Sequence, residues 1–449
     1  MATRGMRTFV VIWAGQVLSL MGSGLSGFAL GVWVFQRTGS ATQFAMIALA
    51  ATLPAVLASP LAGVMVDRWD RRRVMILSDS IAALGTAALA LLYWRGALEL
   101  WHILVASALG ATMGAFQGPA YQASVTLLVP KEQYGRASGM AQMGQALAGV
   151  LSPLLAGVLL VTIGVTGVLL IDLGSYFIAL GTLLAVRIPS PVAERVSAAA
   201  TSIWREAREG WRAIADRRGL RDMLLLFALL NFLLGMVNAL GAPLLLSFLD
   251  PAKLGGVLSL AGIGMLAGSL LMSLWGGPRR KIHGVLGFMV LTGLGVALVG
   301  LRPSPLLVTA GFFTAMLFAP VVNGSSQAIW QRKVPARIQG RVFATRRMVS
   351  LGMAPLAYLL AGPLADHFFG PLMDSDGALA PTLGRWLGAG PGRGIGLMFV
   401  LFGLAAAIAP ALAYLNPALR RVEEDLPDAE EPALVTPEPA PPQPEAAGA

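Results

Sequence analysis

The feature that most constrains this chain is the way its basic residues alternate between long apolar stretches. About twelve such stretches run through the sequence, and only six of the 33 Lys and Arg residues lie in every second gap between them. These six are Arg37, Arg95, Lys253, Arg302, Arg385 and Arg393. Because moving Lys or Arg across a membrane is unfavourable, the other gaps are expected on the cytoplasmic side, together with both termini.

The composition makes a lipid bilayer the expected solvent of most of the chain. Of the 449 residues, 56% are hydrophobic and 12% are charged. Each apolar stretch holds roughly 20 residues, which is about the length of helix that crosses a membrane. Long runs without alternation indicate helices and not a β-barrel, so we predict an all-α polytopic protein with twelve transmembrane helices. The predicted spans are 9–34, 43–66, 74–94, 99–125, 138–162, 165–187, 222–248, 254–275, 282–301, 305–328, 343–369 and 393–416.

The net charge of +10 is unevenly distributed. The segment from Pro417 onward is acidic, so the net positive charge of the preceding residues exceeds the net charge of the whole chain. This excess lies in the predicted cytoplasmic loops, where anionic lipid is the expected partner and nucleic acid is not. With no cysteine, three scattered histidines and no nucleotide-binding motif, the sequence predicts no disulfide, no metal site and no cofactor.

An internal repeat divides the chain into two halves. A shift of 205 residues superposes 121–159 on 326–364 with 13 identities in 39 positions. Repeats of the same polarity predict two bundles related by an axis along the membrane normal, with a binding site at their interface. The predicted units are a six-helix bundle over 1–188, a cytoplasmic linker with an amphipathic helix over 189–221, a second six-helix bundle over 222–416 and a disordered, acidic, Pro-rich tail over 417–449.

The connection between the second and third spans carries the most specific motif. Gly63 lies four residues before Asp67, and Arg68, Arg71 and Arg72 follow. A Gly permits close helix approach, an Asp at a helix end accepts backbone N–H bonds, and an Arg cluster can hold a neighbouring helix end. These residues predict a gating role, and the alternative is a basic anchor at the membrane surface.

This connection resembles the motif between spans two and three of the major facilitator superfamily, with Asp70 in place of the usual Gly. Further motifs resemble the fifth-span motif of the antiporter branch and the macrolide-efflux and enterobactin-exporter type. They comprise a predicted conformational motif, made of Gly149, Pro153, Gly157, Gly340 and Arg341, and the run from Leu359 to Asp366. The resemblance covers residues 1 to about 416 and implies two bundles, alternating access and a central cavity lined by spans one, four, seven and ten.

Those four spans carry uncharged polar residues together with aromatic and Met side chains. A cavity with several amides and adaptable apolar walls suits bulky amphiphiles better than sugars or small ions. The alternative for any one of these residues is a hydrogen bond between helices. The candidate substrate residues are Gln16, Met113, Phe116, Gln117, Asn231, Phe232, Asn238, Met316, Asn323 and Gln327.

Two acids, Asp79 and Asp172, lie inside predicted spans, where a charge costs roughly 2.5–3.5 kcal/mol at the helix centre, and both are candidates for proton coupling. Asp79 is close in sequence to Arg73, and we expect it to interact with the basic loop. Asp172 has Tyr176 one turn away and no basic neighbour in its own span, which makes it the preferred proton-coupling candidate. A structural, hydrogen-bonded Asp is the alternative. The Arg that many drug/proton antiporters carry in the fourth span is missing here.

The sequence therefore predicts a secondary active transporter in the plasma (inner) membrane, acting as a monomer. It would export hydrophobic or amphipathic small molecules, such as a drug, a macrolide or a siderophore-like compound, by alternating access and proton antiport. One alternative is proton-linked uptake of a metabolite. Another, from a different class, is a membrane sensor or enzyme without transport, although no clustered nucleophile, base or metal ligand supports an enzyme.

Overall fold

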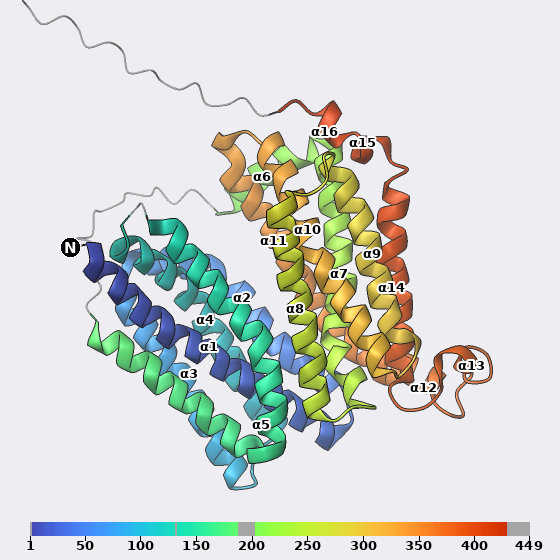
Figure 1. Cartoon of the computed structure of the whole chain (residues 1–449), viewed down its shortest axis with the longest axis horizontal. Helices are drawn as coiled ribbons and strands as arrows, with labels where there is room; N and C mark the ends of the chain where they lie inside the picture. The colour runs from blue at the N-terminus through green and yellow to red at the C-terminus, as the bar shows by residue number, and fades with distance from the viewer. Residues whose placement is uncertain (1, 131–132, 187–202, 429–449) are drawn as a thin grey trace, which may run out of the picture.

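The computed structural model contains two helical bundles placed side by side (Figure 1). It describes residues 2–130, 133–186 and 203–428. The N-terminal bundle contains α1 (Ala2–Thr38), α2 (Ala41–Arg68), α3 (Arg71–Trp94), α4 (Leu100–Leu128) and α5 (Tyr134–Ala185). The C-terminal bundle contains α7 (Arg218–Leu246), α8 (Pro251–Trp275), α9 (Lys281–Leu301), α10 (Pro305–Lys333), α11 (Ala336–Leu364) with a π-helical turn η2 (Ala365–Phe369), the short α12 (Gly370–Met373) and α13 (Gly384–Leu387), and α14 (Arg393–Ala413).

The helix α5 holds two membrane spans. Gly164 interrupts it with φ 67° and ψ −177°, a left-handed conformation that favours glycine. The chain reverses direction at this point, so the two arms of α5 run in opposite directions (Figure 1). The described part of the chain has eleven helices that are long and apolar enough to cross a membrane. With both arms of α5 counted, they make the twelve crossings that the sequence predicts.

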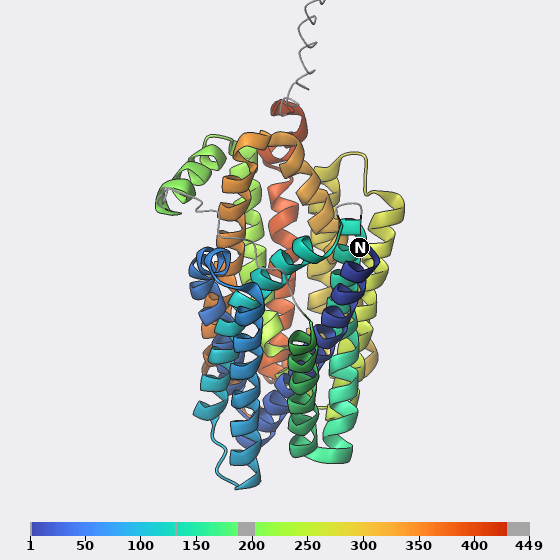
Figure 2. The ribbon, with the colours of Figure 1, turned by 90° about the vertical axis from the view of Figure 1, so that its left-hand side faces the viewer.

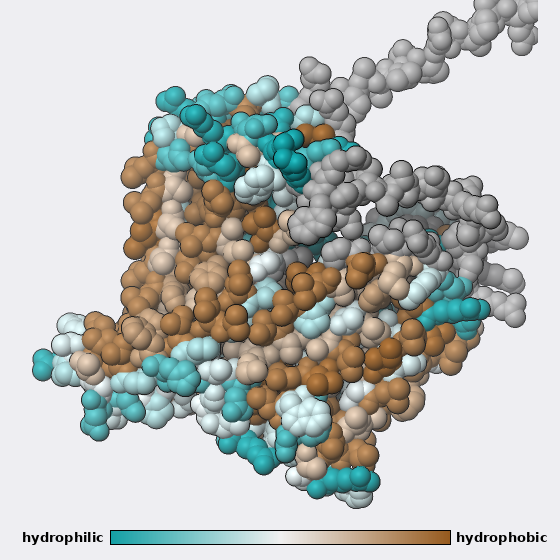
Figure 3. All heavy atoms as spheres, turned by 180° about the vertical axis from the view of Figure 1, so that it is seen from behind, coloured by the Kyte–Doolittle hydropathy of each residue, from teal (hydrophilic) through white to brown (hydrophobic). Residues whose placement is uncertain are grey.

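Apolar side chains cover the flanks of the molecule. Figure 3 shows a broad hydrophobic band on one side of the bundles, with hydrophilic residues gathered at the ends. Large residues such as Leu84 and Phe177 are 70% and 64% exposed within their helices. Exposed apolar area of this extent is expected where helices face lipid.

The two ends of the bundles differ in charge. One end, which we call the basic face, holds the α2–α3, α4–α5, α8–α9 and α10–α11 connections. The other end, which we call the opposite face, holds the six basic residues of the alternate gaps and Gly164. Both ends of the described chain lie toward the basic face, which is at the top of Figures 1 and 2.

The two bundles are inclined to each other and approach most closely toward the opposite face (Figure 1). Gly157 of α5 lies against the backbone of Pro251 and Ala252, where α8 begins. The residue that the 205-residue shift aligns with it, Gly362 of α11, lies against the backbone of Thr42, where α2 begins. The repeat in the sequence thus appears as two equivalent contacts between the bundles.

The linker forms a helix where the amphipathic segment was expected, α6 (Ile203–Ala215). It packs on α11, because Gly210 lies against Thr345 and the backbone of Arg341, and Ile214 is buried. Glu209 of α6 and Arg341 form an ion pair of 2.8 Å. Residues 187–202 of the predicted linker lie outside the described residues.

The tail is not disordered from residue 417 as we predicted. Two short helices follow α14, namely α15 (Pro417–Arg420) and α16 (Val422–Asp425). Leu419 and Val422 are buried in the apolar cluster at the basic end of the C-terminal bundle. Apolar residues at this spacing form one face of a helix, so the start of the tail has a core to join.

Ionic contacts hold the same segment. Lys333, at the end of α10, is buried and donates to the backbone oxygens of Glu423 (2.5 Å) and Leu426 (2.6 Å) and to Asp428 (2.8 Å). Arg332 pairs with Asp428 at 2.7 Å. Hydrogen bonds from Arg332 and then Lys333 hold the pKa of Asp428 below its usual value. Residues 429–449 lie outside the described residues.

Candidate functional site

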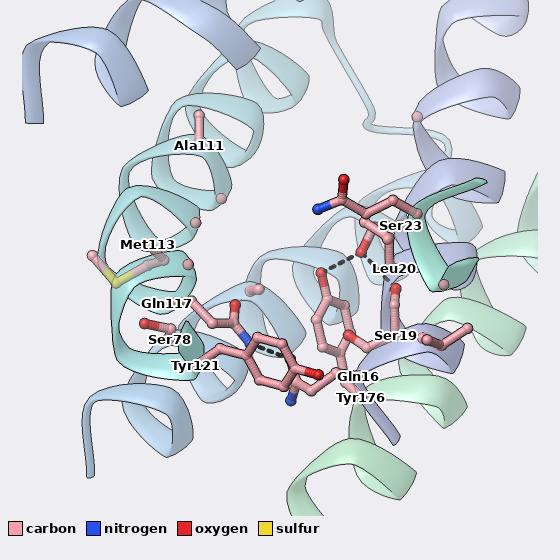
Figure 4. Close-up of a pocket in the computed structure, with 18 of the residues that line it drawn as sticks. Gln16, Ser19, Leu20, Ser23, Ser78, Ala111, Met113, Gln117, Tyr121 and Tyr176 are labelled. Atoms are coloured by element: carbon pink, nitrogen blue, oxygen red, sulfur yellow. Dashed lines mark hydrogen bonds between the residues drawn. The ribbon is translucent and has the colours of Figure 1, made fainter. Parts of the chain in front are cut away.

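A cavity of about 620 Å³ lies inside the N-terminal bundle (Figure 4). Residues of α1, α2, α3, α4 and both arms of α5 line it, and none of the described lining residues carries a formal charge. Its apolar wall includes Trp13, Met113, Tyr121 and Tyr176. Cavities of this size and character hold drug-sized organic molecules.

A hydrogen-bonded network of two amides and one carboxylate forms the polar part of this wall. Gln16 Nε2 donates to Asp79 Oδ2 (3.0 Å), and Gln117 Nε2 donates to Asp79 Oδ1 (2.6 Å). Gln117 Nε2 also donates to Gln16 Oε1 at 2.8 Å. Both amides line the cavity, whereas Asp79 is 1% exposed and lies behind them. The network joins α1, α3 and α4.

The prediction that Asp79 interacts with the basic loop is wrong. Its hydrogen-bond partners are the two amides, which reach it from α1 and α4. Sequence distance to Arg73 was a poor guide, because polar side chains from neighbouring helices lie closer than the end of the residue's own helix. Each carboxylate oxygen accepts an N–H bond from an amide, and none of these donors is a cation.

Asp172, the second buried acid, lies outside the cavity lining and has fewer partners. Its Oδ2 accepts from Thr86 Oγ1 at 3.1 Å, while its Oδ1 has no hydrogen-bond partner. Gly22 of α1 lies directly against Oδ1. One turn further along α1, Ser26 Oγ is buried near Asp172, without a hydrogen bond of good geometry between them. Such orphaned buried polar atoms are uncommon and call for an explanation.

Tyr176 connects the region of Asp172 to the cavity. It lies one turn after Asp172 on the second arm of α5, and its ring lines the cavity. Its hydroxyl and Ser23 Oγ are 2.9 Å apart, as the dashed line in Figure 4 marks. Tyr176 therefore lines the cavity from the same helix arm that carries Asp172.

The structure brings together only part of the predicted substrate set. Gln16, Met113 and Gln117 line the cavity, whereas Phe116 packs against an apolar cluster that includes Val66 and Met75. The six candidates of the second half do not contribute to this cavity. They are Asn231, Phe232, Asn238, Met316, Asn323 and Gln327.

The surroundings of three of these second-half residues explain why. Phe232 and Met316 pack against the core of the C-terminal bundle. Gln327 accepts a 2.9 Å bond from Arg346 Nη1, and the same guanidinium lies over the ring of Trp330 at 5.4 Å. Periodicity alone could not separate a cavity wall from a bundle core.

The other amides of the second half lie nearer the surface of the helices. Asn238 is exposed, and its Oδ1 is 3.4 Å from the Tyr358 hydroxyl. Asn323 is exposed as well, and Asn231 is half-buried. A role for these amides in substrate binding stays a prediction.

The predicted gating motif lies where α2 ends and α3 begins. Asp70 caps α3 by accepting from the backbone N–H of Arg73 (2.9 Å). Arg72 donates to the backbone oxygens of Leu183 (2.8 Å) and Leu184 (2.9 Å) at the end of α5. A guanidinium at a helix C-terminus satisfies free carbonyl groups and opposes the helix dipole.

The rest of that motif is less fully described. Gly63 lies within α2, and the side chains of Asp67 and Arg68 are outside the described set. Two nitrogens of Arg71, Nε and Nη1, are buried without a hydrogen-bond partner. A gating role for the five residues remains a prediction.

The predicted conformational motif of the first arm of α5 faces the other bundle. Gly255 of α8 lies against Pro153 and Gly157, and Ser259 of α8 donates to the backbone oxygen of Val150 at 2.6 Å. Gly149 follows the same face, since its backbone oxygen lies near Gly262. Close contact through glycine backbones permits one helix to slide on another.

Four polar residues of this region were not singled out from the sequence. Ser78 and Tyr121 line the cavity, and Thr86 and Ser26 lie beside Asp172. Hydroxyl groups are common within membrane helices, so Ser and Thr carry little information on their own. Tyr121 is different, because tyrosines are scarce in this chain and this one lies within an apolar span, four residues from the span's end at Val125.

The fold and the sequence place this chain among known proteins. The family model of the Major Facilitator Superfamily matches residues 12–358. The chain belongs to the major facilitator superfamily. Macrolide efflux protein A of Streptococcus pyogenes is 30% identical over 369 residues, which are 80% of this chain and 89% of that protein. Multidrug efflux pump Tap of Mycolicibacterium fortuitum is 25% identical over 354 residues, 77% of this chain and 86% of Tap.

Solved structures of other transporters share the fold. A bacterial homolog of the human lysosomal transporter Spinster, in an inward-facing and unoccupied conformation, has a TM-score of 0.70 and 17% identity, covering 96% of this chain and all of that one. The nucleoside transporter NupG has a TM-score of 0.68 and 13% identity, with coverage of 91% of this chain and 99% of NupG. The chain is thus a multi-pass membrane transporter for a small molecule, and not an enzyme.

Proposed function

We propose that this superfamily member exports bulky amphipathic drugs, including macrolides, in exchange for protons. The observation that carries the proposal is the cavity of about 620 Å³, whose walls join aromatic and Met side chains to two amides. The names of the macrolide and multidrug efflux relatives agree with a substrate of this kind. Apolar burial would supply most of the binding energy, and the amides would orient the molecule.

In this proposal the amide network serves the substrate. Gln117 Nε2 donates one hydrogen bond to Gln16 and one to Asp79. Together these bonds fix the direction of the Gln117 side-chain carbonyl group. A fixed carbonyl oxygen at the cavity wall would accept a hydrogen bond from a hydroxyl or ammonium group of the substrate. Asp79 would hold the two amides in place and contribute its negative field to the site.

Asp172 would carry the exchanged proton. A proton on Oδ1 turns this orphaned oxygen into a donor, and Ser26 Oγ on the adjacent face of α1 is a buried group that lacks a partner. The described structure would accordingly represent the protonated state. Release of the proton would leave a carboxylate anion with one hydroxyl partner. A buried anion of this kind is unstable, so proton release would be coupled to a conformational change that stabilises it.

The basic face would lie in the cytoplasm, with both termini, as the distribution of Lys and Arg requires. The contacts between bundles near the opposite face would then close the outer side, and the described state would open inward. Rocking of the bundles around the glycine contacts of α5 with α8 would expose the cavity to the outside. The protein would act as a monomer.

Accumulation of a labelled macrolide in cells with and without the protein tests this function. We expect lower accumulation with the protein, and equal accumulation after a protonophore collapses the pH gradient. Gln117→Leu should weaken the effect, whereas Gln142→Leu, which removes an exposed amide of α5 outside the cavity lining, serves as the matched control.

Higher accumulation with the protein would favour the alternative of proton-linked uptake. If purified protein in liposomes moved no amphiphile under any gradient, a sensor without transport would become the better explanation.

A further inference from the structure

Asp366 joins the two bundles with three hydrogen bonds. Its carboxylate accepts from Ser40 Oγ (2.7 Å), from Ala41 N (3.0 Å) and from Thr42 N (2.9 Å). Asp366 belongs to the C-terminal bundle, and the three donors lie at the beginning of α2 in the N-terminal bundle. All three bonds therefore cross the interface between the bundles.

The local structure presents Asp366 to the start of α2. The first N–H groups of a helix have no partner within it, and the helix dipole favours an anion there. Asp366 lies in the π-helical turn η2, where the helix after Pro363 widens. One turn before it, Gly362 contacts the backbone of Thr42, which brings α11 within reach of these N–H groups.

The two halves of the internal repeat share a glycine contact between the bundles, but only the second half carries an acid beside it. The 205-residue shift pairs Gly362 with Gly157, and both glycines touch the first residues of a helix in the other bundle. The same shift pairs Asp366 with Val161, which is apolar. At the second contact α8 is capped by Asp250, which comes from its own chain segment and accepts from Lys253 N at 2.9 Å.

We infer that Asp366 is a latch that holds the opposite face closed and stabilises the described state over the state open on that face. The inference rests on the alternating access of the proposed function. Separation of the bundles at this face would break the hydrogen bonds between the carboxylate and the N–H groups of Ala41 and Thr42. The three bonds thus exist in one state of the cycle and break in the other, which is what a latch requires.

The natural chain has no cysteine, so pairs of nitroxide labels can be placed on it directly. Positions 95 and 302, both exposed, report the distance between the bundles at the opposite face. Positions 138 and 279, also exposed, report that distance at the basic face. Pulsed electron spin resonance on purified protein in lipid then gives the populations of the two states.

In the Asp366→Asn variant we expect the population with the longer 95–302 distance to rise about tenfold relative to the population with the shorter distance. For the 138–279 pair we expect the opposite change, with the shorter distance gaining population. Asp250→Asn is the matched control, since it removes the same charge at the same face from a contact within one bundle, and Asn remains a good helix cap. Ser40→Ala, which removes one of the three bonds, should give a smaller shift in the same direction.

Equal distance distributions in wild type, Asp366→Asn and Asp250→Asn would overturn the latch. The proposed function would fail differently, because then wild type itself would keep one distribution at both faces with and without a macrolide. A variant that unfolds elutes as aggregate on gel filtration, and the Ser40→Ala protein then decides the question.

Discussion

Two carboxylates in the N-terminal bundle share the same chemistry and the same burial, yet their surroundings differ. Asp79 and Asp172 are each 1% exposed. Asp79 accepts amide N–H bonds at both oxygens, whereas Asp172 accepts one hydroxyl bond and keeps one oxygen without a partner. The difference shows that burial does not by itself define the role of an acid in a membrane helix.

Hydrogen-bond partners supply the distinction. Amide donors satisfy both oxygens of Asp79, so this residue suits a fixed part of the binding wall. Asp172 has one oxygen without a well-formed hydrogen bond, so its charged form is less well stabilised than a carboxylate with donors at both oxygens. On this account Asp79 orders the substrate site and Asp172 exchanges the proton.

The largest effect is expected from Asp172→Asn. The amide can donate to Ser26 and accept from Thr86, so the variant should fold like the protonated protein, but it has no proton to release. Accumulation of a labelled macrolide in inside-out vesicles under an imposed pH gradient should fall to background. Exchange of labelled for unlabelled macrolide without a gradient should persist, and its loss would assign Asp172 a structural role.

An intermediate effect is expected from Asp79→Asn. The new Nδ2 would face a Gln N–H donor in place of an acceptor, which costs roughly 1–3 kcal/mol in a buried network. The macrolide concentration for half-maximal transport should rise about tenfold, which corresponds to about 1.4 kcal/mol. Dependence on the pH gradient should remain, and if it vanished the roles of the two acids would have to be exchanged.

A smaller effect is expected from Tyr176→Phe. The change keeps the ring in the cavity wall and removes only the bond to Ser23, which is worth about 0.5–1.5 kcal/mol. Macrolide affinity, measured by quenching of tryptophan fluorescence, should fall about threefold. An effect as large as that of Asp172→Asn would show that the hydroxyl takes part in proton transfer.

The smallest effect is expected in the C-terminal bundle. Asn238→Ala removes a single long contact of 3.4 Å to Tyr358 outside the cavity, so transport should change by less than about twofold. Transport kinetics in the same vesicles measure this change. A tenfold loss would place part of the substrate site in this bundle, as the sequence had suggested.

The sequence predicted the fold closely, because hydrophobic length and the distribution of Lys and Arg report directly on membrane crossing. The ends of helices were less accurate. The eleventh span was predicted from residue 343, but α11 begins at Ala336. The predicted spans stop where charged residues begin, but charged residues are compatible with a helix, so a helix can continue beyond the lipid.

The candidate site was predicted in part, for a physical reason. Gln16 and Gln117 were found because an amide within an apolar span needs a partner. Which partner it takes depends on helix packing, so neither the Asp79 network nor the pairing of Gln327 with Arg346 could be derived from spacing. The folded start of the tail was missed because acidic composition masked the spacing of Leu419 and Val422.

The most direct test of the account is a count of protons when substrate binds. Purified protein in weakly buffered detergent solution is mixed with a macrolide while a pH indicator reports release. We predict that the wild-type protein and Asp79→Asn release protons on binding and that Asp172→Asn releases none while still binding the macrolide. Equal release from Asp172→Asn and wild type would contradict the assignment of the exchanged proton to Asp172.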